Sequence, residues 1–214
     1  MITRLKRTFQ YLYQRPSRYV ETENARILRG KGMFIPPDAI ICVHGGGFTQ
    51  RGWAPWEGFK ERFSDYTIAE LDYSLVGEGG NKSVNVYEVH RLASYLRRNY
   101  LAHRVFVVGT SAGATIAASC DSGYVDGVVC LYGITKTTDL PDFLVDATER
   151  WGSPYPSYNG GLLWIHGRDD TLVPVSHADR VRGWNNRVVI YDGGHSEKVT
   201  RFEPEIRQYL NARS

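Results

Sequence analysis

The sequence contains no apolar run long enough to cross a membrane, because no segment approaches the roughly 18 apolar residues that a spanning helix needs. It also has no apolar run of signal-peptide length near its start, and we therefore expect a cytoplasmic protein. Cysteine is scarce. The three cysteines, Cys42, Cys120 and Cys130, show neither CxxC nor metal-ligand spacing, so we interpret them as small core residues and expect no bound metal.

Acidic residues are missing from the first twenty positions, which carry five basic residues between Arg4 and Arg18. The whole chain has a net charge of +3, so the residues after Val20 carry −2, and we expect no nucleic-acid partner. The same segment has apolar residues at helical spacing, which predicts a basic amphipathic helix. Such a helix could lie on a membrane surface, but we favour packing on its own domain or on a second subunit. The apolar positions are Ile2, Leu5, Phe9, Leu12 and Tyr13.

The length of 214 residues fits one domain, because a single core can grow to roughly 250 residues before chains usually divide. Short β-branched runs alternate with helical patterns along the chain, as expected for a parallel sheet covered by helices. Several runs are apolar almost throughout, which is typical of buried parallel strands. The predicted strands are 39–43, 66–71, 104–108, 127–132, 161–165 and 187–191.

Helical periodicity predicts the covering elements. Ser83 can cap a helix that continues to Arg97 and Arg98, whose charges suit its C-terminal dipole. Residues 133–160 contain three prolines and join two predicted strands, so we interpret them as a small lid insertion with one short helix at 142–148. Residues 1–38 form an N-terminal extension. Further helices are predicted at 112–120, 176–184 and 196–211, the last divided at Pro204.

The predicted strand 104–108 leads directly into a G-x-S-x-G sequence formed by Gly109, Ser111 and Gly113, followed by a helical run of small residues. A serine on a sharp strand-to-helix turn occupies strained backbone, and glycines two positions on either side avoid collisions. The turn lifts the hydroxyl to the carboxyl edge of the sheet, where ligands bind in open α/β folds. G-x-S-x-G alone also arises by chance in loops, but the flanking strand and helix favour Ser111 as a nucleophile.

The sequence HGGGF, residues 44–48, follows the first strong strand. Glycines at this place let backbone N–H groups point at a carbonyl oxygen, and together with the N–H of Ala112 they could bind the oxyanion of a tetrahedral intermediate. A merely flexible loop is the simple alternative. A phosphate-binding loop is disfavoured because the spacing and the lysine of a P-loop are missing.

Three motifs together, HGGGF, then ELDYSL at residues 70–75, then GTSAG at residues 109–113, resemble the hormone-sensitive-lipase-like carboxylesterases of the α/β-hydrolase family. The resemblance covers roughly residues 39–200. It implies an α/β-hydrolase fold: a mostly parallel twisted sheet with helices on both faces, here with a reduced cap. It also implies that Gly46 and Gly47 supply the oxyanion donors.

A serine hydroxyl needs a base and a group that orients this base. In this fold the order along the chain is serine, acid, histidine. His166-Gly-Arg-Asp-Asp170-Thr-Leu-Val173-Pro resembles the family's HGxxDxxVP, in which Asp170 matches the position of the acid. Asp169 is the alternative, with a turn or capping role otherwise. By the same resemblance, His166 is a structural histidine at a strand end.

Two histidines follow the predicted acid. His195 comes after the last strand, and Gly193 and Gly194 before it allow the backbone to turn towards Ser111. His177 lies only seven residues after Asp170 in a predicted helix, so we interpret it as a surface residue, like His90 and His103. We therefore predict His195 as the base.

The predicted reaction is acyl transfer through an acyl-enzyme on Ser111, with a small-molecule carboxylic ester as substrate and no cofactor. Phe48 and Trp53 follow the oxyanion loop and are candidate substrate-binding residues, although aromatic residues of this kind often belong to the core. An arylformamidase, a thioesterase or a peptidase would use the same groups. A noncatalytic ligand-binding relative is the alternative from a different class. The oligomeric state stays open.

Overall fold

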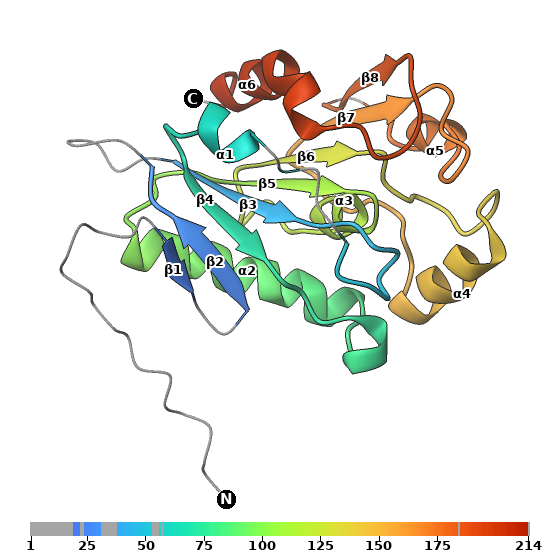
Figure 1. The fold of residues 1–214 in the computed structure, drawn as a ribbon, viewed down its shortest axis with the longest axis horizontal. Helices are drawn as coiled ribbons and strands as arrows, with labels where there is room; N and C mark the ends of the chain where they lie inside the picture. Colours follow the sequence, from blue (N-terminus) through green and yellow to red (C-terminus); the bar gives the residue numbers. More distant parts are fainter. Residues whose placement is uncertain are drawn as a thin grey trace, which may run out of the picture.

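The computed structural model describes residues 19–21, 24–30, 38–52, 56, 58–183 and 185–213. These residues form one eight-stranded sheet with helices on both faces (Figure 1). The amphipathic helix predicted between Ile2 and Tyr13 lies outside the described residues.

The sheet has the strand order β1-β2-β4-β3-β5-β6-β7-β8, and the six strands from β4 to β8 in this order run parallel. All six predicted strands are confirmed, with boundaries within two residues of those observed. β1 and β2 pair antiparallel at one edge and were not predicted, because three or four residues are too few to establish a periodicity. The strands are Tyr19–Glu21, Ala25–Leu28, Ala39–Val43, Thr67–Leu71, Val105–Thr110, Gly127–Leu131, Leu162–Gly167 and Arg187–Tyr191.

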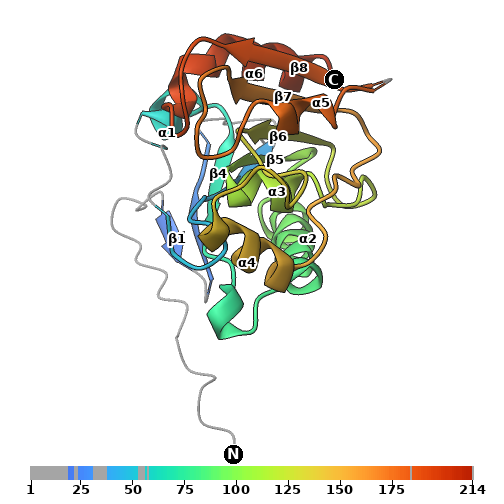
Figure 2. The same cartoon turned by 90° about the vertical axis from the view of Figure 1, so that its right-hand side faces the viewer.

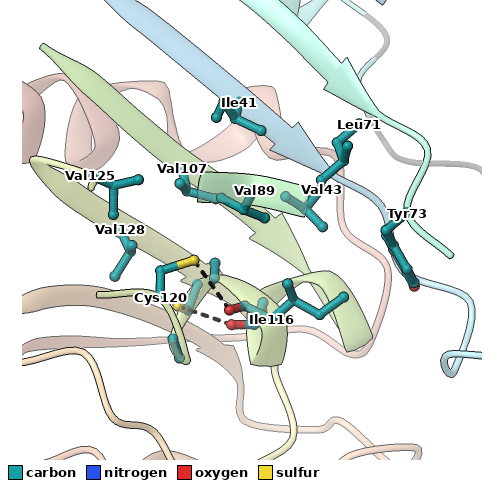
Figure 3. Packing of buried hydrophobic residues seen from close by; sticks show 14 of the residues in the cluster. Ile41, Val43, Leu71, Tyr73, Val89, Val107, Ile116, Cys120, Val125 and Val128 are labelled. Atoms are coloured by element: carbon teal, nitrogen blue, oxygen red, sulfur yellow. Dashed lines mark hydrogen bonds between the residues drawn. The ribbon is translucent and has the colours of Figure 1, made fainter. Parts of the chain in front are cut away.

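Helices α2 (Lys82–Asn99) and α3 (Ala112–Ala117) cover one face of the sheet, and α1 (Phe59–Arg62) and α6 (Glu203–Asn211) cover the other (Figure 2). Side chains of β3 alternate between two hydrophobic clusters, since successive residues of a strand point to opposite faces. Figure 3 shows part of the cluster beneath α2 and α3, in which the Cys120 thiol donates to the Ile116 carbonyl. All three cysteines are buried and free, as predicted. No described helix combines the length and apolarity needed to span a bilayer.

Several predicted helices differ in their bounds from those observed; α3, for example, ends at Ala117 instead of residue 120. Helix α2 is capped by Asn81, whose side chain accepts from the Val84 N–H, whereas Ser83 lies inside the helix. Asn is as good an N-cap as Ser, so composition did not separate the two. Helix α5 ends at Asp179, earlier than predicted, and the Asn186 side chain donates to the Val181 carbonyl in the segment that follows. Short 3-10 helices, η1 and η2, occupy Val76–Glu78 and Val199–Phe202.

Pro204 divides the last helical segment as predicted, since it stands in the first turn of α6, directly after η2. The helix predicted in the insertion is confirmed as α4, Asp142–Trp151, which lies in front of the carboxyl ends of the strands (Figure 2). The Trp151 ring stacks on Phe48, and its indole N–H donates to the Asn85 side chain over 2.8 Å. These contacts hold α4 against the HGGGF loop, residues 44–48, and against α2.

Candidate active site

Ser111 stands on a sharp turn between β5 and α3, with φ of 52° and ψ of −120°. A positive φ is uncommon for a residue other than glycine and marks a locally strained backbone. The neighbouring glycines are required by space: a Cβ added to Gly109 would lie 2.2 Å from the Gly113 carbonyl oxygen, and one added to Gly113 would lie 2.2 Å from the Val43 carbonyl oxygen. The glycine requirement predicted from the sequence is confirmed.

Gly113→Ala is expected to lower the free energy of unfolding by about 3 kcal/mol, because the obstructing atoms belong to the backbone of β3 and cannot move aside cheaply. Urea unfolding followed by circular dichroism measures this loss. Gly77→Ala serves as the matched control, since a Cβ at Gly77 meets no atom within 4 Å. Equal stability of the two variants would contradict the steric account of the turn.

The structure brings Ser111, His195 and Asp170 together as predicted, although 84 and 25 residues separate the paired positions. His195 Nε2 lies 3.0 Å from Ser111 Oγ, and His195 Nδ1 lies 2.7 Å from Asp170 Oδ2. A carboxylate only accepts hydrogen bonds, so Nδ1 carries the proton and Nε2 is free to accept from the serine hydroxyl. The His195 side chain is only 11% exposed and that of Asp170 is fully buried.

Asp170 is held in place from several sides. Its Oδ1 accepts the N–H groups of Leu172 and Val173 over 3.0 and 2.8 Å. Burial raises the pKa of this carboxyl, but hydrogen bonds from His166, His195 and the Val173 N–H outweigh burial and lower it below its usual range. Asp170 therefore stays ionised at neutral pH. Asp169, the alternative acid, is exposed and does not contact His195 in the hydrogen bonds of the described residues.

His166 lies behind the acid, at the end of β7, and is fully buried. The Trp164 indole N–H donates to its Nδ1 over 3.1 Å, which leaves the ring proton on Nε2. That Nε2 lies 2.7 Å from the Val173 carbonyl oxygen and 3.5 Å from Asp170 Oδ2. The structure thus places His166 at a strand end, as the resemblance implied.

The interpretation of His177 as a surface residue is wrong, because the structure buries it completely. Its Nδ1 accepts the Thr135 N–H over 3.1 Å, and its Nε2 has no partner among the described residues. Helix α5 packs against β7, and His177, its second residue, faces inward. Of the other two histidines interpreted as surface residues, His103 is exposed and His90 is half-buried.

Burial, and then the charge of Lys136, lower the pKa of His177 from 6.5 to about 4. Between these pH values the unfolded chain binds a proton that the folded chain does not, so the stability falls as the pH falls from 6.5 towards 4. The loss from this group is expected to reach about 3 kcal/mol at pH 4. The measurement is urea unfolding of native protein and His177→Gln at several pH values.

The difference between the two proteins isolates His177, because His44 and His90 also have lowered pKa values and act in the same direction. His177→Gln should lose less stability over the window than the native chain, whereas exposed His103→Gln should match the native chain. Parallel curves for native protein and His177→Gln would contradict the expectation.

The HGGGF loop lies directly beside the nucleophile: a Cβ added to Gly45 would be 3.1 Å from Ser111 Cβ. Gly46 has φ of 106°, and a Cβ there would lie 2.0 Å from the Gln50 carbonyl oxygen. The N–H groups of Thr49 and Gln50 both donate to the Gly46 carbonyl and close the turn. The loop therefore has one fixed conformation that needs glycine, which argues against a merely flexible linker.

The predicted oxyanion donors are available. Within the described part of the chain, no acceptor takes the N–H groups of Gly46, Gly47 or Ala112. Ala112 is the first residue of α3, where unpaired N–H groups and the helix dipole favour negative charge. Leu144 of α4 packs over this loop, since its Cδ2 would lie 2.9 Å from a Cβ on Gly47.

Two side chains contact the backbone of the HGGGF loop and restrict its conformation. His44 Nδ1 lies 2.6 Å from the Gly45 carbonyl oxygen, and the Tyr73 hydroxyl donates to the same oxygen over 3.2 Å. The two rings stack with centroids 4.3 Å apart. Because a peptide group is planar, holding the Gly45 carbonyl also sets the direction of the Gly46 N–H. The contact between Tyr73 and the Gly45 carbonyl was not predicted from the sequence, since only the folded chain brings the end of β4 and this loop together.

The prediction that Phe48 binds substrate is not supported, because its side chain is fully buried against Trp151. The stacking partner comes from the insertion, which a sequence pattern could not pair with the loop. Trp53 lies outside the described residues. Among the described residues, no group of three or more His, Cys, Asp or Glu side chains is arranged to hold a metal ion.

The sheet and the serine turn at its carboxyl edge define an α/β-hydrolase fold. No protein-family model matches the sequence, and no curated protein matches it. Solved structures do match.

The acetyl ester-xyloside bifunctional hydrolase from Caldicellulosiruptor lactoaceticus is 16% identical over 88% of each chain, with a TM-score of 0.65. A truncated carbohydrate esterase from gut microbiota is 15% identical over 89% of this chain and 90% of that chain, with a TM-score of 0.69. Esterase 2 of Thermogutta terrifontis, phosphonylated by sarin, is 16% identical over 87% of this chain and 88% of that chain, with a TM-score of 0.69. These similarities establish the fold.

Proposed function

We propose that this protein is a serine hydrolase that cleaves small carboxylic esters through an acyl-enzyme on Ser111. The observation that carries the proposal is the unbroken chain of hydrogen bonds from Ser111 through His195 to Asp170, 3.0 and 2.7 Å long. A nucleophile within reach of a base, which is itself oriented by a buried acid, is the arrangement that activates a serine hydroxyl.

In the proposed cycle, His195 Nε2 takes the proton of Ser111 as Oγ attacks the ester carbonyl. Asp170 keeps the imidazole in the tautomer that can accept this proton and stabilises the imidazolium that results. The imidazolium then gives its proton to the departing alkoxide. Water, deprotonated by the same imidazole, attacks the acyl-enzyme; the bond between Ser111 Oγ and the acyl group breaks, the acid is released, and the imidazolium returns its proton to Oγ.

Negative charge develops on the carbonyl oxygen of the ester during the attack. The N–H groups of Gly46, Gly47 and Ala112 stabilise this charge by donating hydrogen bonds to the oxygen. Their lack of acceptors among the described residues supports this assignment. Donors that are fixed before the reaction need no reorganisation in the transition state, and removing one typically costs about 3 kcal/mol of the barrier. The position of Ala112 at the start of α3 adds the favourable dipole of the helix.

The ester substrate class is supported by the nature of the structural neighbours, which include an acetyl ester hydrolase, a carbohydrate esterase and an esterase. The phosphonylated esterase is an informative neighbour, since phosphonylation is a reaction of a nucleophile. Small acyl groups are the first substrates to try.

The test is hydrolysis of p-nitrophenyl acetate by the purified native protein, before and after treatment with a fluorophosphonate. We expect turnover that disappears as one phosphonyl group per chain is bound to the peptide containing Ser111. A native protein that neither turns over the ester nor reacts with the fluorophosphonate would favour a noncatalytic ligand-binding role. A panel of formamides and thioesters at equal concentration then ranks the ester against the related carbonyl substrates.

A further inference from the structure

The loop that carries His195 is held by two tyrosine hydroxyls, from the carboxyl ends of β6 and β8, the two strands that flank β7. Tyr191 donates to the Gly194 carbonyl oxygen over 2.6 Å, and Tyr132 donates to the Glu197 carbonyl oxygen over 3.1 Å. One contact falls on the residue before His195 and the other two residues after it. The histidine is therefore bracketed by two anchored carbonyl groups.

The first anchor acts directly on the backbone of the histidine. The Gly194 carbonyl and the His195 N–H belong to one planar peptide group. The Tyr191 hydroxyl therefore fixes the orientation of the peptide plane that joins Gly194 to His195. The loop itself has an unusual path, with φ of 151° at Gly193 and 69° at Ser196. A non-glycine residue at positive φ persists only where the surroundings hold it, and the two hydroxyls are suited to that task.

Tyr132 connects the histidine loop with the other two parts of the site. The Leu131–Tyr132 peptide group accepts the Ser111 N–H at its carbonyl over 2.9 Å and donates its own N–H to the Ile165 carbonyl over 2.7 Å. Ile165 belongs to β7, the strand that leads to Asp170. One peptide plane thus joins the serine turn to the strand of the acid, and the side chain of the same residue reaches the loop of the base.

The Tyr132 ring also limits the orientation of the imidazole. Its centroid lies 4.7 Å from that of His195, at an interplanar angle of 58°. Tyr132 has φ of 44°, an uncommon value for a tyrosine, and is 1% exposed. The unusual backbone aims the side chain away from the path of β6 and across to the histidine loop.

We propose that Tyr132, assisted by Tyr191, is a positioning residue that sets the distance between the His195 imidazole and Ser111. The proposal rests on the proposed esterase function. The two hydroxyls affect catalysis by positioning His195, the base, and they do not contact the substrate. Burial raises the pKa of both phenols above the ordinary value, so both remain hydrogen-bond donors at neutral and moderately alkaline pH.

The test compares Tyr132→Phe and Tyr191→Phe with Tyr158→Phe. All three substitutions remove one hydroxyl that donates to a backbone carbonyl, and Tyr158 donates to Val125 over 3.3 Å, in the core beneath α3 and away from the histidine loop. We expect Tyr132→Phe to lower kcat for p-nitrophenyl acetate about tenfold with KM almost unchanged, because the lost hydrogen bond loosens the base and not the substrate. Tyr191→Phe should act in the same direction, and Tyr158→Phe should leave kcat as in the native protein.

A second measurement separates positioning from general stability. The His195 Nδ1 proton, bonded to Asp170, should give a low-field proton resonance in the native protein and in Tyr158→Phe, and a shifted or broadened resonance in Tyr132→Phe. Native kcat and a native resonance in both Tyr132→Phe and Tyr191→Phe would overturn the proposal. If Tyr132→Phe does not fold, Tyr191→Phe is measured alone with the same two readouts. Failure of the esterase function itself would be evident separately, as an inert native protein.

Discussion

Ser111→Ala and His195→Ala are each expected to lower kcat for p-nitrophenyl acetate by about five to six orders of magnitude. Among the described residues, the hydroxyl of Ser111 is hydrogen-bonded to no base other than His195, at 3.0 Å, so this contact is its route for losing a proton. Residues that act as a unit are not additive, so the double variant should be about as slow as either single variant. Stopped-flow assays measure kcat of the native protein, and assays with long time courses measure the much lower kcat of the variants.

The control for these variants is Ser119→Ala, which removes another buried hydroxyl shortly after α3, where it donates to the Thr115 carbonyl. Its kcat should remain close to the native value. Alanine at position 111 adopts the same positive φ that serine does, so the fold is expected to survive and circular dichroism checks this. Residual activity of Ser111→Ala within tenfold of the native enzyme would contradict Ser111 as the nucleophile.

Asp170→Asn is expected to lower kcat by about four orders of magnitude. An amide can donate to Nδ1 and thereby place the imidazole proton on Nε2, the wrong nitrogen for accepting from Ser111. The N–H groups of Leu172 and Val173 both donate to Oδ1, so the amide oxygen is expected to take that position and the amide NH2 group to face His195. The measurement is kcat over a range of pH.

Asp169→Asn is the matched comparison, since this carboxyl is one residue away and exposed. Its backbone N–H donates to the Gly193 carbonyl, a contact that the substitution leaves in place. We therefore expect native kcat. The opposite ranking of the two variants would mean that the acid has been assigned to the wrong residue.

Much of this architecture was predictable from the sequence, because parallel strands buried on both faces appear as short apolar runs. Ala39–Val43 and Arg187–Tyr191 were predicted with the boundaries observed. The serine turn was predictable for a steric reason, since Gly109 and Gly113 have no room for a side chain. The choice of Asp170 over Asp169 came from spacing, and the structure places Asp170 beside the histidine.

The remainder depends on contacts between distant segments, which leave no local pattern. His177 is polar and has the period of a surface helix, yet the packing of α5 on β7 buries it. Phe48 is the last residue of the HGGGF sequence, yet the Trp151 ring of α4 stacks on its side chain and buries it. Tyr132 and Tyr191 show their contacts with the histidine loop only once β6, β8 and that loop have assembled.

The proposed mechanism requires that the hydroxyl of Ser111 becomes acylated during turnover. Rapid chemical quench of the native protein with p-nitrophenyl acetate, followed by peptide mass spectrometry, tests this most directly. We expect a burst of p-nitrophenol and one acetyl group on the peptide that contains Ser111. Neither should be seen in Ser111→Ala. Turnover by the native protein with no acetylated peptide, or with the acetyl group on another residue, would contradict it.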